Sequence, residues 1–439
     1  SVRTRFIQVR KFGAALKNTI GKIFDKTQAK DGSMSPFQAV CTALAGTVGT
    51  GNIAGVAGAI ALGGPGAIFW MWCSAFLGMC TKFSEVTLAI HFREKNANGE
   101  YVGGPMYYIK NGLSKKWHFL AVLYALFGVL TVFGTGNATQ VNTIVSSIHS
   151  ALHNLHIIDG TVDERANLIF GIFIAAFVAM VLLGGIQRIG QVSEKLVPFM
   201  AALYVILAIG VVILHISRVP AVFAMIFKSA FTPQAATGGI IGSMFLSMKK
   251  GVSRGIFSNE AGLGSAPIAA AAAQTKEPVR QGLVSMTGTF IDTIVICTLT
   301  GLSIVLTGAW QVPGLEGVDV TTYAFQQGLP FPPQISAFIL MLCLVFFAFT
   351  TILGWDYYSE RCLEYLSGGN IKHVKIFRWI YILAVFIGPY MTVSAVWTIA
   401  DIFNGLMAIP NMIAIFALSG VVVKETRDFF QRHKEGKIK

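Results

Sequence analysis

Apolar stretches long enough to cross a bilayer alternate with short polar segments along most of the chain. A membrane-spanning helix needs about 20 predominantly apolar residues. Spans are predicted near 36–62, 66–91, 118–148, 167–185, 195–216, 236–249, 282–308, 334–358 and 375–392. A last apolar region, 393–423, is expected to cross once after a kinked or re-entrant piece, because Asn404, Gly405, Pro410 and Asn411 interrupt it. This pattern predicts an all-α integral membrane protein.

The amino-acid composition narrows the class of protein further. Hydrophobic residues make up 54% of the 439 residues and charged residues only 13%, whereas an average soluble domain carries about 25% charge. Because so few charges cannot cover a water-exposed surface, most of the surface must face lipid. A cytosolic enzyme and a disordered chain are therefore excluded. The net charge of +13 is not taken as a sign of a nucleic-acid partner. Membrane proteins concentrate Lys and Arg in their cytoplasmic loops, and this explains the excess of positive charge.

The distribution of Lys and Arg predicts which ends of the spans face the cytoplasm. Residues 1–30 contain eight Lys or Arg and one acid, and residues 424–439 contain six Lys or Arg. Both ends are therefore predicted to be cytoplasmic, which requires an even number of crossings. Ten crossings suit two inverted repeats of five helices. The predicted units are a basic N-terminal segment, two repeats and a basic tail, over 1–35, 36–216, 217–423 and 424–439.

The first span contains a cluster of glycines that is poorly suited to a continuous helix. Gly46, Gly49 and Gly51 fall close together, and each glycine in a helix costs about 1 kcal/mol relative to alanine. Unwound backbone is tolerated at membrane depth where it lines a cavity or is buried in protein, and its carbonyls can then bind a cation. One alternative is that small residues only allow close helix packing, with Gly51 and Gly55 in GxxxG spacing. A nucleotide-binding loop is a poor match, because the glycine spacing is wrong and no strand precedes it.

A second break is predicted in the corresponding helix of the second half. Residues 237–243 read Thr-Gly-Gly-Ile-Ile-Gly-Ser, inside a candidate helix over 236–273. The first helices of two inverted repeats are where discontinuous helices and substrate sites occur together. Paired glycine breaks are therefore the strongest sign of organisation, although the two halves share no obvious sequence.

Several long motifs resemble the alanine-or-glycine:cation symporter family of prokaryotes. The most specific motifs cover 42–55, 64–72, 103–108, 254–267, 290–293 and 404–410, and the likeness extends from the first residues to about Val423. The resemblance implies a LeuT-type bundle of five-plus-five inverted repeats within the amino acid–polyamine–organocation superfamily. It also implies import of small amino acids with Na⁺, or sometimes H⁺. Family members usually carry one further hydrophobic helix before the basic segment, so we expect that helix to precede Ser1.

The resemblance also implies a sodium site between the first and eighth spans. Its ligands would be the carbonyls of Ala45 and Val48, the hydroxyls of Thr350 and Thr351, and the carbonyl of Phe347. A hard cation prefers oxygen ligands, and neutral oxygens can suffice. The alternative is that the two threonine hydroxyls bind only carbonyls of their own helix.

Donors for the carboxylate of an amino acid and acceptors for its ammonium group are expected near the first break. The candidate substrate residues are Thr50, Gly51, Asn52, Gln140, Phe245 and Trp355. The backbone and side chains of the first three would hold the carboxylate, Gln140 can both donate and accept, and the two aromatic side chains would cover a small side chain. An interhelical hydrogen bond for Gln140 and ordinary packing for the aromatic residues are the alternatives.

Acidic residues inside predicted spans are functional hypotheses, because a charge is costly in a membrane. Four acids are of this kind, Glu85, Asp292, Asp356 and Asp401. Asp356 departs from the family pattern, which often has a small neutral residue there. We expect Asp356 either to pair with an Arg or Lys near the cytoplasmic side or to add a proton step.

Residues 254–267 resemble a family motif that is interpreted as a cytoplasmic helix after the sixth span. In this interpretation the motif supports the inner gate and carries no ligand. Arg254 and Glu260 are expected to pair with other segments of the chain.

Together with the resemblance, which implies the coupling ion and the substrate, the sequence predicts a sodium-coupled symporter that imports alanine or glycine by alternating access across the prokaryotic plasma (inner) membrane. No nucleophile–base set, metal cluster or P-loop is found in the sequence, so no enzymatic activity is predicted. The alternatives are a proton-coupled symporter, a member that prefers glutamine or serine, a channel, and a membrane-embedded enzyme. The sequence does not choose the amino acid, because one methylene in an apolar pocket is worth only about 1–3 kcal/mol.

Overall fold

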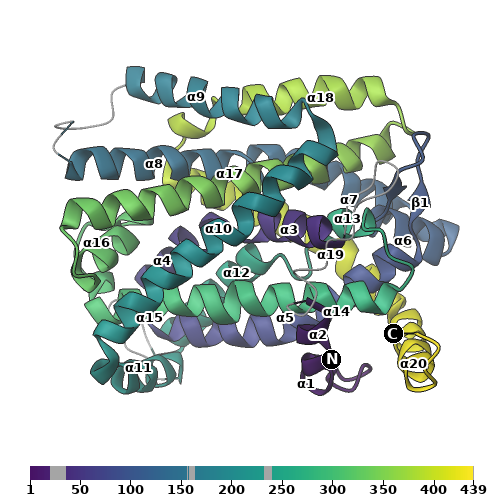
Figure 1. The fold of residues 1–439 in the computed structure, drawn as a ribbon, viewed down its shortest axis with the longest axis horizontal. Helices are drawn as coiled ribbons and strands as arrows, with labels where there is room; N and C mark the ends of the chain where they lie inside the picture. The colour runs from purple at the N-terminus through teal and green to yellow at the C-terminus, as the bar shows by residue number, and fades with distance from the viewer. Residues whose placement is uncertain (20–35, 156, 158–163, 232–239, 439) are drawn as a thin grey trace.

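The computed structural model describes residues 1–19, 36–155, 157, 164–231 and 240–438. Helices make up most of the described chain (Figure 1). Two short strands, β1 (Glu94–Lys95) and β2 (Tyr101–Val102), form an antiparallel hairpin in which Glu94 pairs with Val102. The prediction of an all-α membrane architecture is confirmed for these residues.

The helices have the following bounds. The longer ones are α3 (Pro36–Thr47), α4 (Ala54–Gly63), α5 (Gly66–His91), α7 (Phe119–Leu130), α8 (Ala138–Asn154), α9 (Glu164–Leu182), α10 (Gly185–Leu214), α11 (Val219–Phe231), α12 (Ile240–Asn259), α14 (Pro278–Thr289), α15 (Thr298–Thr307), α16 (Val318–Gly328), α17 (Pro333–Leu366), α18 (Ile371–Ala384), α19 (Val393–Ala417) and α20 (Ser419–Lys434). The shorter ones are α1 (Ile7–Arg10), α2 (Phe12–Thr19), α6 (Pro105–Gly112) and α13 (Ala266–Ala271).

Seven helical segments of the described residues are long and apolar enough to cross a membrane. They are α5, α9, α10, α17, α19 and the joined segments Lys115–Asn154 and Pro278–Thr307. A bent pair, Cys41–Thr47 with Thr50–Gly63, gives an eighth candidate. The predicted spans near 236–249 and 375–392 fall on α12 and α18, which do not meet the same combination of length and apolarity. Ten crossings therefore stay a prediction.

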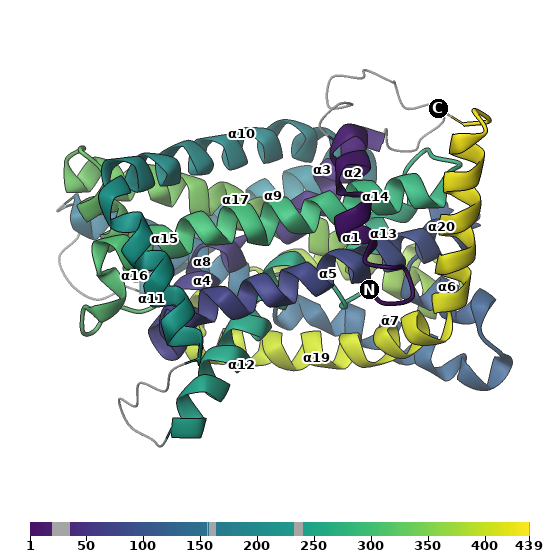
Figure 2. The same ribbon diagram turned by 90° about the horizontal axis from the view of Figure 1, so that it is seen from below.

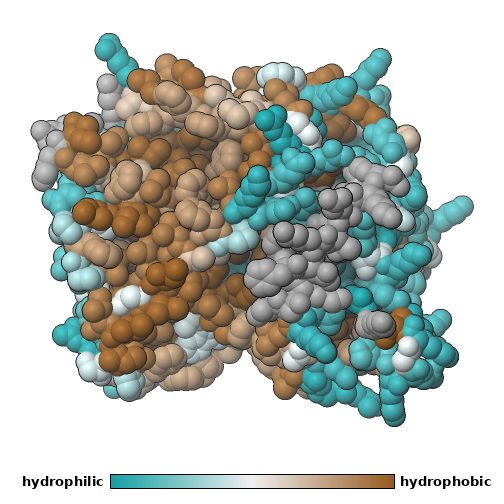
Figure 3. All heavy atoms as spheres, viewed as in Figure 1, coloured by the Kyte–Doolittle hydropathy of each residue, from teal (hydrophilic) through white to brown (hydrophobic). Residues whose placement is uncertain are grey.

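The exposed surface of the long helices is strongly apolar. Large side chains on it include Phe173, Ile206 and Phe416, which are 62%, 68% and 70% exposed. Figure 3 shows apolar side chains over much of this face and hydrophilic ones gathered toward the end that holds the two termini. An apolar surface of this extent marks a membrane contact.

The two ends of the bundle hold different elements. Both termini, the β-hairpin and α20 lie at one end, and α11 and α16 lie at the other (Figures 1 and 2). The two basic ends of the chain are thus on the same side, as an even number of crossings requires. The hairpin is tied to α13, because Arg93 donates hydrogen bonds to the carbonyls of Ala271 (2.9 Å) and Ala273 (2.7 Å).

The interruption predicted within 393–423 at Asn404, Gly405, Pro410 and Asn411 is not found. α19 is one helix from Val393 to Ala417, and it contains Asn404, Gly405, Pro410 and Asn411 without a break. The two asparagine side chains are buried and bind neighbouring segments, since Thr135 donates to Asn404 Oδ1 (2.9 Å) and Asn411 donates to the Gly262 carbonyl (2.8 Å). The polar residues of this region therefore join helices together.

Candidate functional site

The first predicted break is present at the position that the glycine cluster indicates. α3 ends at Thr47, a 3₁₀ turn covers Thr50–Asn52, α4 begins at Ala54, and the two halves are bent by 53°. The backbone N–H of Gly49 donates to Asn52 Oδ1 (2.9 Å). In a continuous helix that N–H would bond the carbonyl of Ala45, so the turn releases this carbonyl from the helix.

Close packing and the break occur together at these glycines. A Cβ at Gly46 would lie 2.5 Å from the hydroxyl of Tyr358, and a Cβ at Gly49 would collide with Thr351 Oγ1. A Cβ at Gly354 would in turn lie 3.0 Å from Gly46 Cα. The glycines therefore allow α17 to approach the unwound backbone, so the packing explanation and the break explanation both hold.

The second break lies elsewhere than predicted. Residues 237–239 are outside the described residues, and α12 then runs as a helix from Ile240 to Asn259. The chain leaves helical geometry between Asn259 and Ala266, where Glu260, Gly262 and Gly264 have positive φ angles of 56°, 98° and 76°. The prediction of a break at 237–243 is thus wrong for its described part. Residues 254–267 also do not form the predicted single helix, because they comprise the end of α12, the break and the start of α13.

The two broken helices pack against each other half by half. α4 packs against α12, and α3 packs against α13. A Cβ at Gly51 in the first break would lie 2.8 Å from the ring of Phe257 and 3.2 Å from the backbone of Ser258. The first unwound segment, 48–53, therefore lies against the last turn of α12, directly before the second unwound segment, 260–265.

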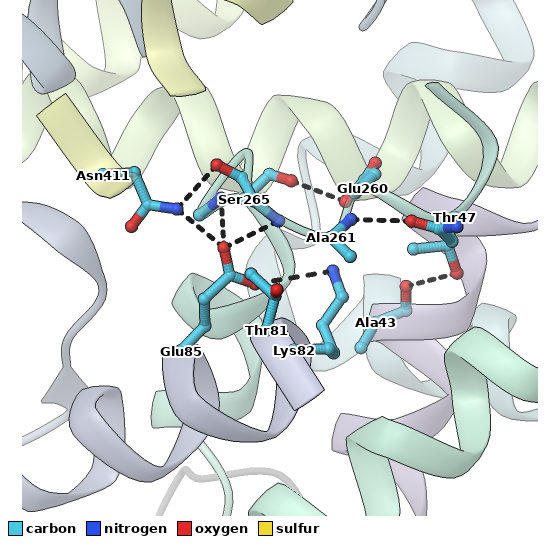
Figure 4. A network of polar contacts seen from close by, with 12 residues as sticks. Ala43, Thr47, Thr81, Lys82, Glu85, Glu260, Ala261, Ser265 and Asn411 are labelled. Atoms are coloured by element: carbon cyan, nitrogen blue, oxygen red, sulfur yellow. Dashed lines mark hydrogen bonds and ion pairs between the residues drawn. The ribbon is translucent and has the colours of Figure 1, made fainter. Parts of the chain in front are cut away.

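Glu85, which lies on α5, binds the backbone of the second break. Its Oε1 accepts hydrogen bonds from the backbone N–H groups of Gly262 (3.0 Å) and Gly264 (3.1 Å) and from the side chain of Asn411 (2.6 Å). Figure 4 shows these three bonds converging on one carboxylate oxygen. The other oxygen lies 4.0 Å from Lys82 Nζ. Since Glu85 is fully buried, these contacts replace the water that the carboxylate loses.

Asp292 connects the two breaks. It lies on a π-helical segment, Phe290–Cys297, that joins α14 to α15. Its carboxylate accepts hydrogen bonds from Asn52 Nδ2 (2.7 Å), Ser258 Oγ (2.8 Å) and Thr293 Oγ1 (2.7 Å). π-helical turns inside α-helices occur frequently at functional sites. The intramembrane acid thus fixes the asparagine of the first break to the end of α12.

The structure brings three of the five predicted sodium ligands to one point. Thr351 Oγ1 lies 3.0 Å from the Ala45 carbonyl oxygen and 2.9 Å from the Phe347 carbonyl oxygen. Val48 is buried, and the next residue, Gly49, lies against Thr351. The Thr350 hydroxyl lies 3.1 Å from the same Phe347 carbonyl oxygen, but its other neighbours are the Phe346 carbonyl of its own helix (3.0 Å) and the sulfur of Met200 on α10 (3.5 Å), not the first break.

Four of the predicted substrate residues lie beside the first break. Thr50 N lies 3.5 Å from Gln140 Oε1, and Gln140 also donates to the Thr135 carbonyl (3.0 Å). The hydroxyl of Thr50 has no hydrogen-bond partner in the described part of the chain. Asn52 is held by Asp292, and Gly51 lies under Phe257.

The two predicted aromatic residues differ in position. Trp355 is 1% exposed and lies against Gly136, where a Cβ would be 2.8 Å from Trp355 Cβ. Phe245 is 53% exposed on α12 and does not join the buried group. The aromatic ring over the break belongs to Phe257, whose ring centroid is 4.6 Å from that of Trp397. Sequence reasoning missed Phe257, although it precedes the Ser-Asn-Glu sequence and the two glycines of the second break.

The charged residues near the break are partly paired. Arg254 makes a two-pronged ion pair with Asp401 (2.9 Å for each bond) between α12 and α19 and lies 4.3 Å from the Trp397 ring, so its predicted pairing is confirmed. The expected pairing of Asp356 is not formed. Asp356 is fully buried, neither of its oxygens has a hydrogen-bond partner among the described residues, and Arg378 binds Glu360 instead (2.8 Å).

The fold and the comparison with a solved structure define the class of protein. The crystal structure of MhsT in complex with L-phenylalanine matches this chain with a TM-score of 0.56 at 12% identity, covering 90% of this chain and 100% of that chain. MhsT is a LeuT-fold transporter, and a likeness at this identity establishes the fold alone. The chain therefore has the α-helical, LeuT-type fold of a multi-pass membrane protein.

Sequence comparisons then give the family. The family model described as "Sodium:alanine symporter family" matches residues 1–439. The sodium/alanine symporter AgcS of Methanococcus maripaludis is 46% identical over 99% of this chain and 92% of that protein. The probable sodium/glutamine symporter GlnT of Bacillus subtilis is 39% identical over 99% and 86%. The putative sodium/proton-dependent alanine carrier YrbD of the same bacterium is 37% identical over 99% and 88%. The chain belongs to the sodium:alanine symporter family, which consists of transporters and not enzymes.

Proposed function

We propose that this protein couples the inward sodium gradient to the import of a small neutral amino acid, alanine or glycine, across the prokaryotic plasma membrane. The observation that carries the proposal is the meeting of Ala45, Phe347 and Thr351. The carbonyl oxygens of Ala45 and Phe347 lie 3.0 and 2.9 Å from Thr351 Oγ1, and its one hydroxyl proton can serve one carbonyl at a time. All three oxygens could coordinate a sodium ion at this point.

The place of the ion in the fold supports the same proposal. In transporters with discontinuous helices, carbonyls of the unwound backbone coordinate the coupling ion, and the half-helix that follows receives the substrate carboxylate. The Ala45 carbonyl is released by the turn, and Thr50–Asn52 directly precede α4. Alternating access would then join and separate the segments around the two breaks.

The crowding around the first break favours a small substrate. Phe257, Trp355 and Gln140 are all buried around Gly51 and Gly136, where a Cβ would lie 2.8 Å from its neighbour. Alanine and glycine need the least additional space. The relative named as a sodium/glutamine symporter is the reason to include glutamine in the first substrate panel.

A proton-coupled symporter is the second candidate. It is favoured by Asp356, whose buried carboxyl group has no hydrogen-bond partner among the described residues, and by the relative named as sodium/proton-dependent. Uptake that persists without sodium and collapses with a protonophore would establish this alternative.

The decisive experiment is uptake of radiolabelled alanine into proteoliposomes under an imposed Na⁺ gradient or an equal K⁺ gradient. We expect accumulation with Na⁺ alone. In Thr351→Val, which keeps the side-chain shape, the sodium concentration for half-maximal uptake should rise at least about tenfold, the factor that corresponds to roughly 1.4 kcal/mol. Thr398→Val is the matched control, because Thr398 is exposed and bonds only within α19. Sodium-independent uptake by the unaltered protein would refute the proposed coupling.

A further inference from the structure

Buried acids outnumber buried bases around the two breaks. Glu85, Glu260 and Asp292 are 0%, 1% and 0% exposed. Lys82, which is 2% exposed, is the base within electrostatic range of all three carboxylates among the described residues. A buried charge is costly unless it is paired and hydrogen-bonded. Further positive charge or hydrogen-bond donors would therefore stabilise these three carboxylates.

The three carboxylates differ in how many hydrogen bonds the protein donates to them. Asp292 receives three hydrogen bonds over both of its oxygens, and Glu85 receives three on Oε1 while Oε2 faces Lys82. Glu260 Oε2 accepts one hydrogen bond, from Ser265 Oγ (2.6 Å). Glu260 Oε1 accepts none from the residues that the structure describes. Of the three acids, Glu260 has the least support.

The backbone position of Glu260 is unusual as well. It begins the second break with a φ angle of 56°, a value that a residue with a side chain rarely adopts. Strained residues of this kind cluster at functional sites, where the surrounding structure holds them in place. The side chain is thereby fixed between the end of α12 and α17, and Figure 4 shows it beside the turn that leads to Ser265.

The side chains that face Glu260 also lack partners. The indole N–H of Trp355 lies beside the Glu260 carboxylate without forming a hydrogen bond of normal geometry, and Tyr358 lies within electrostatic range of it. The hydroxyl of Tyr358 is likewise without a partner among the described residues, and it lies against Gly46 near the end of α3. An unpartnered acceptor and two unpartnered polar groups thus lie together at the second break, and one of them, the Tyr358 hydroxyl, also lies against the end of α3.

We propose that Glu260 Oε1 receives the α-ammonium group of the transported amino acid. This inference rests on the proposed function and deepens it by naming the side chain that would bind the ammonium group of the substrate. The ammonium group supplies both the positive charge and the N–H donors that Glu260 lacks. The carboxylate of the substrate would lie at Thr50–Asn52, so opposite ends of the zwitterion contact opposite breaks. Sodium is assigned to the neutral oxygens around Thr351, none of which is hydrogen-bonded to Glu260 among the described residues.

The test compares alanine with (S)-lactate, in which a hydroxyl replaces the ammonium group. The unaltered protein in proteoliposomes should prefer alanine strongly, measured by competition against radiolabelled alanine. In Glu260→Gln, the KM for alanine should rise roughly 10- to 100-fold, the range expected when a charged hydrogen bond is lost. Inhibition by lactate should stay the same, so the preference for alanine collapses, while the sodium concentration for half-maximal uptake stays unchanged. Glu316→Gln, an exposed acid far along the chain in the loop before α16, is the control.

Each result has one meaning. If the unaltered protein takes up no amino acid, the proposed function fails, and the inference with it. If the unaltered protein transports alanine but Glu260→Gln keeps the KM and the preference over lactate, only the inference is overturned. A large change in sodium dependence with preference retained would assign Glu260 to a cation site and also overturn it. If Glu260→Gln does not fold, Glu260→Asp decides, since a raised KM with retained preference supports the inference and an unchanged KM overturns it.

Discussion

The two breaks in the helices are built by different chemistry. The first break is neutral, and its glycines let α17 approach closely enough for Thr351 to reach the Ala45 carbonyl. The second break is held by a charge, because Glu85 binds the backbone of Gly262 and Gly264. Its glycines are needed for positive φ angles. The same residue type therefore serves contact at one break and backbone conformation at the other.

This difference indicates a division of work between the breaks. Neutral oxygens at the first break suit a monovalent cation that must leave again, because they hold it less strongly than a carboxylate would. The second break presents an acid, Glu260, toward the interior. Substitutions that change either the close contact at the first break or the backbone conformation at the second break can test these different roles.

The largest effect is expected for Gly264→Ala at the second break. Gly264 has a φ angle of 76°, and an added Cβ would collide with the ring of Pro105. Strain and steric overlap together should destabilise the fold by about 3 kcal/mol or more. Thermal unfolding of the purified protein in detergent measures the effect, with Gly405→Ala as the control, because a Cβ at Gly405 meets nothing within 4 Å. Equal melting temperatures for the two variants would contradict the conformational role.

A smaller effect on the fold, but a large one on coupling, is expected for Gly49→Ala at the first break. Gly49 has an extended backbone with a φ angle of −141°, which alanine adopts readily, so the variant should fold. The added Cβ collides with Thr351 Oγ1 and should displace it from the Ala45 carbonyl. The sodium concentration for half-maximal uptake should therefore rise about tenfold, equivalent to roughly 1.4 kcal/mol, with the melting temperature little changed. Unaltered sodium dependence would separate Thr351 from the coupling ion.

The smallest effect is expected for Thr350→Val. The Thr350 hydroxyl lies against carbonyls of its own helix and Met200, so its removal should cost less than about 1 kcal/mol. Sodium dependence should change less than twofold, in contrast with Thr351→Val. If the two variants lose sodium dependence equally, the site uses both hydroxyls and Thr350 must turn toward α3 when the ion binds.

The sequence allowed the first break to be predicted because its signal is local, whereas the contact of the break with α17 was implied by the family resemblance. Three glycines with polar residues between them are hard to place in a continuous helix, and the threonine pair lies in one short motif. Thr351 lies against Ala45, whereas Thr350 faces its own helix. The rotation of a helix about its axis decides which of two adjacent hydroxyls faces a neighbour, and packing sets that rotation.

The second break could not be located in the same way. The glycines at 237–243 form a denser cluster than Gly262 and Gly264, so glycine count alone favours the wrong segment. The true break depends on Glu85, which is 177 residues from Gly262 in the chain, and on Asn411 from α19. Phe245 and Phe257 both lie on α12, and only the position of the true break brings Phe257 over Gly51.

The absence of charge among Ala45, Phe347 and Thr351 has an electrical consequence for the proposed sodium symport. Neutral ligands do not cancel the charge of the ion they hold, and a zwitterionic amino acid adds none. The loaded protein would therefore carry one more positive charge than the empty protein when its site passes from the outer to the inner face. A membrane potential that is negative inside acts on such a step with about 2.3 kcal/mol per charge for each 100 mV. The voltage across the membrane would then drive accumulation in addition to the sodium concentration difference.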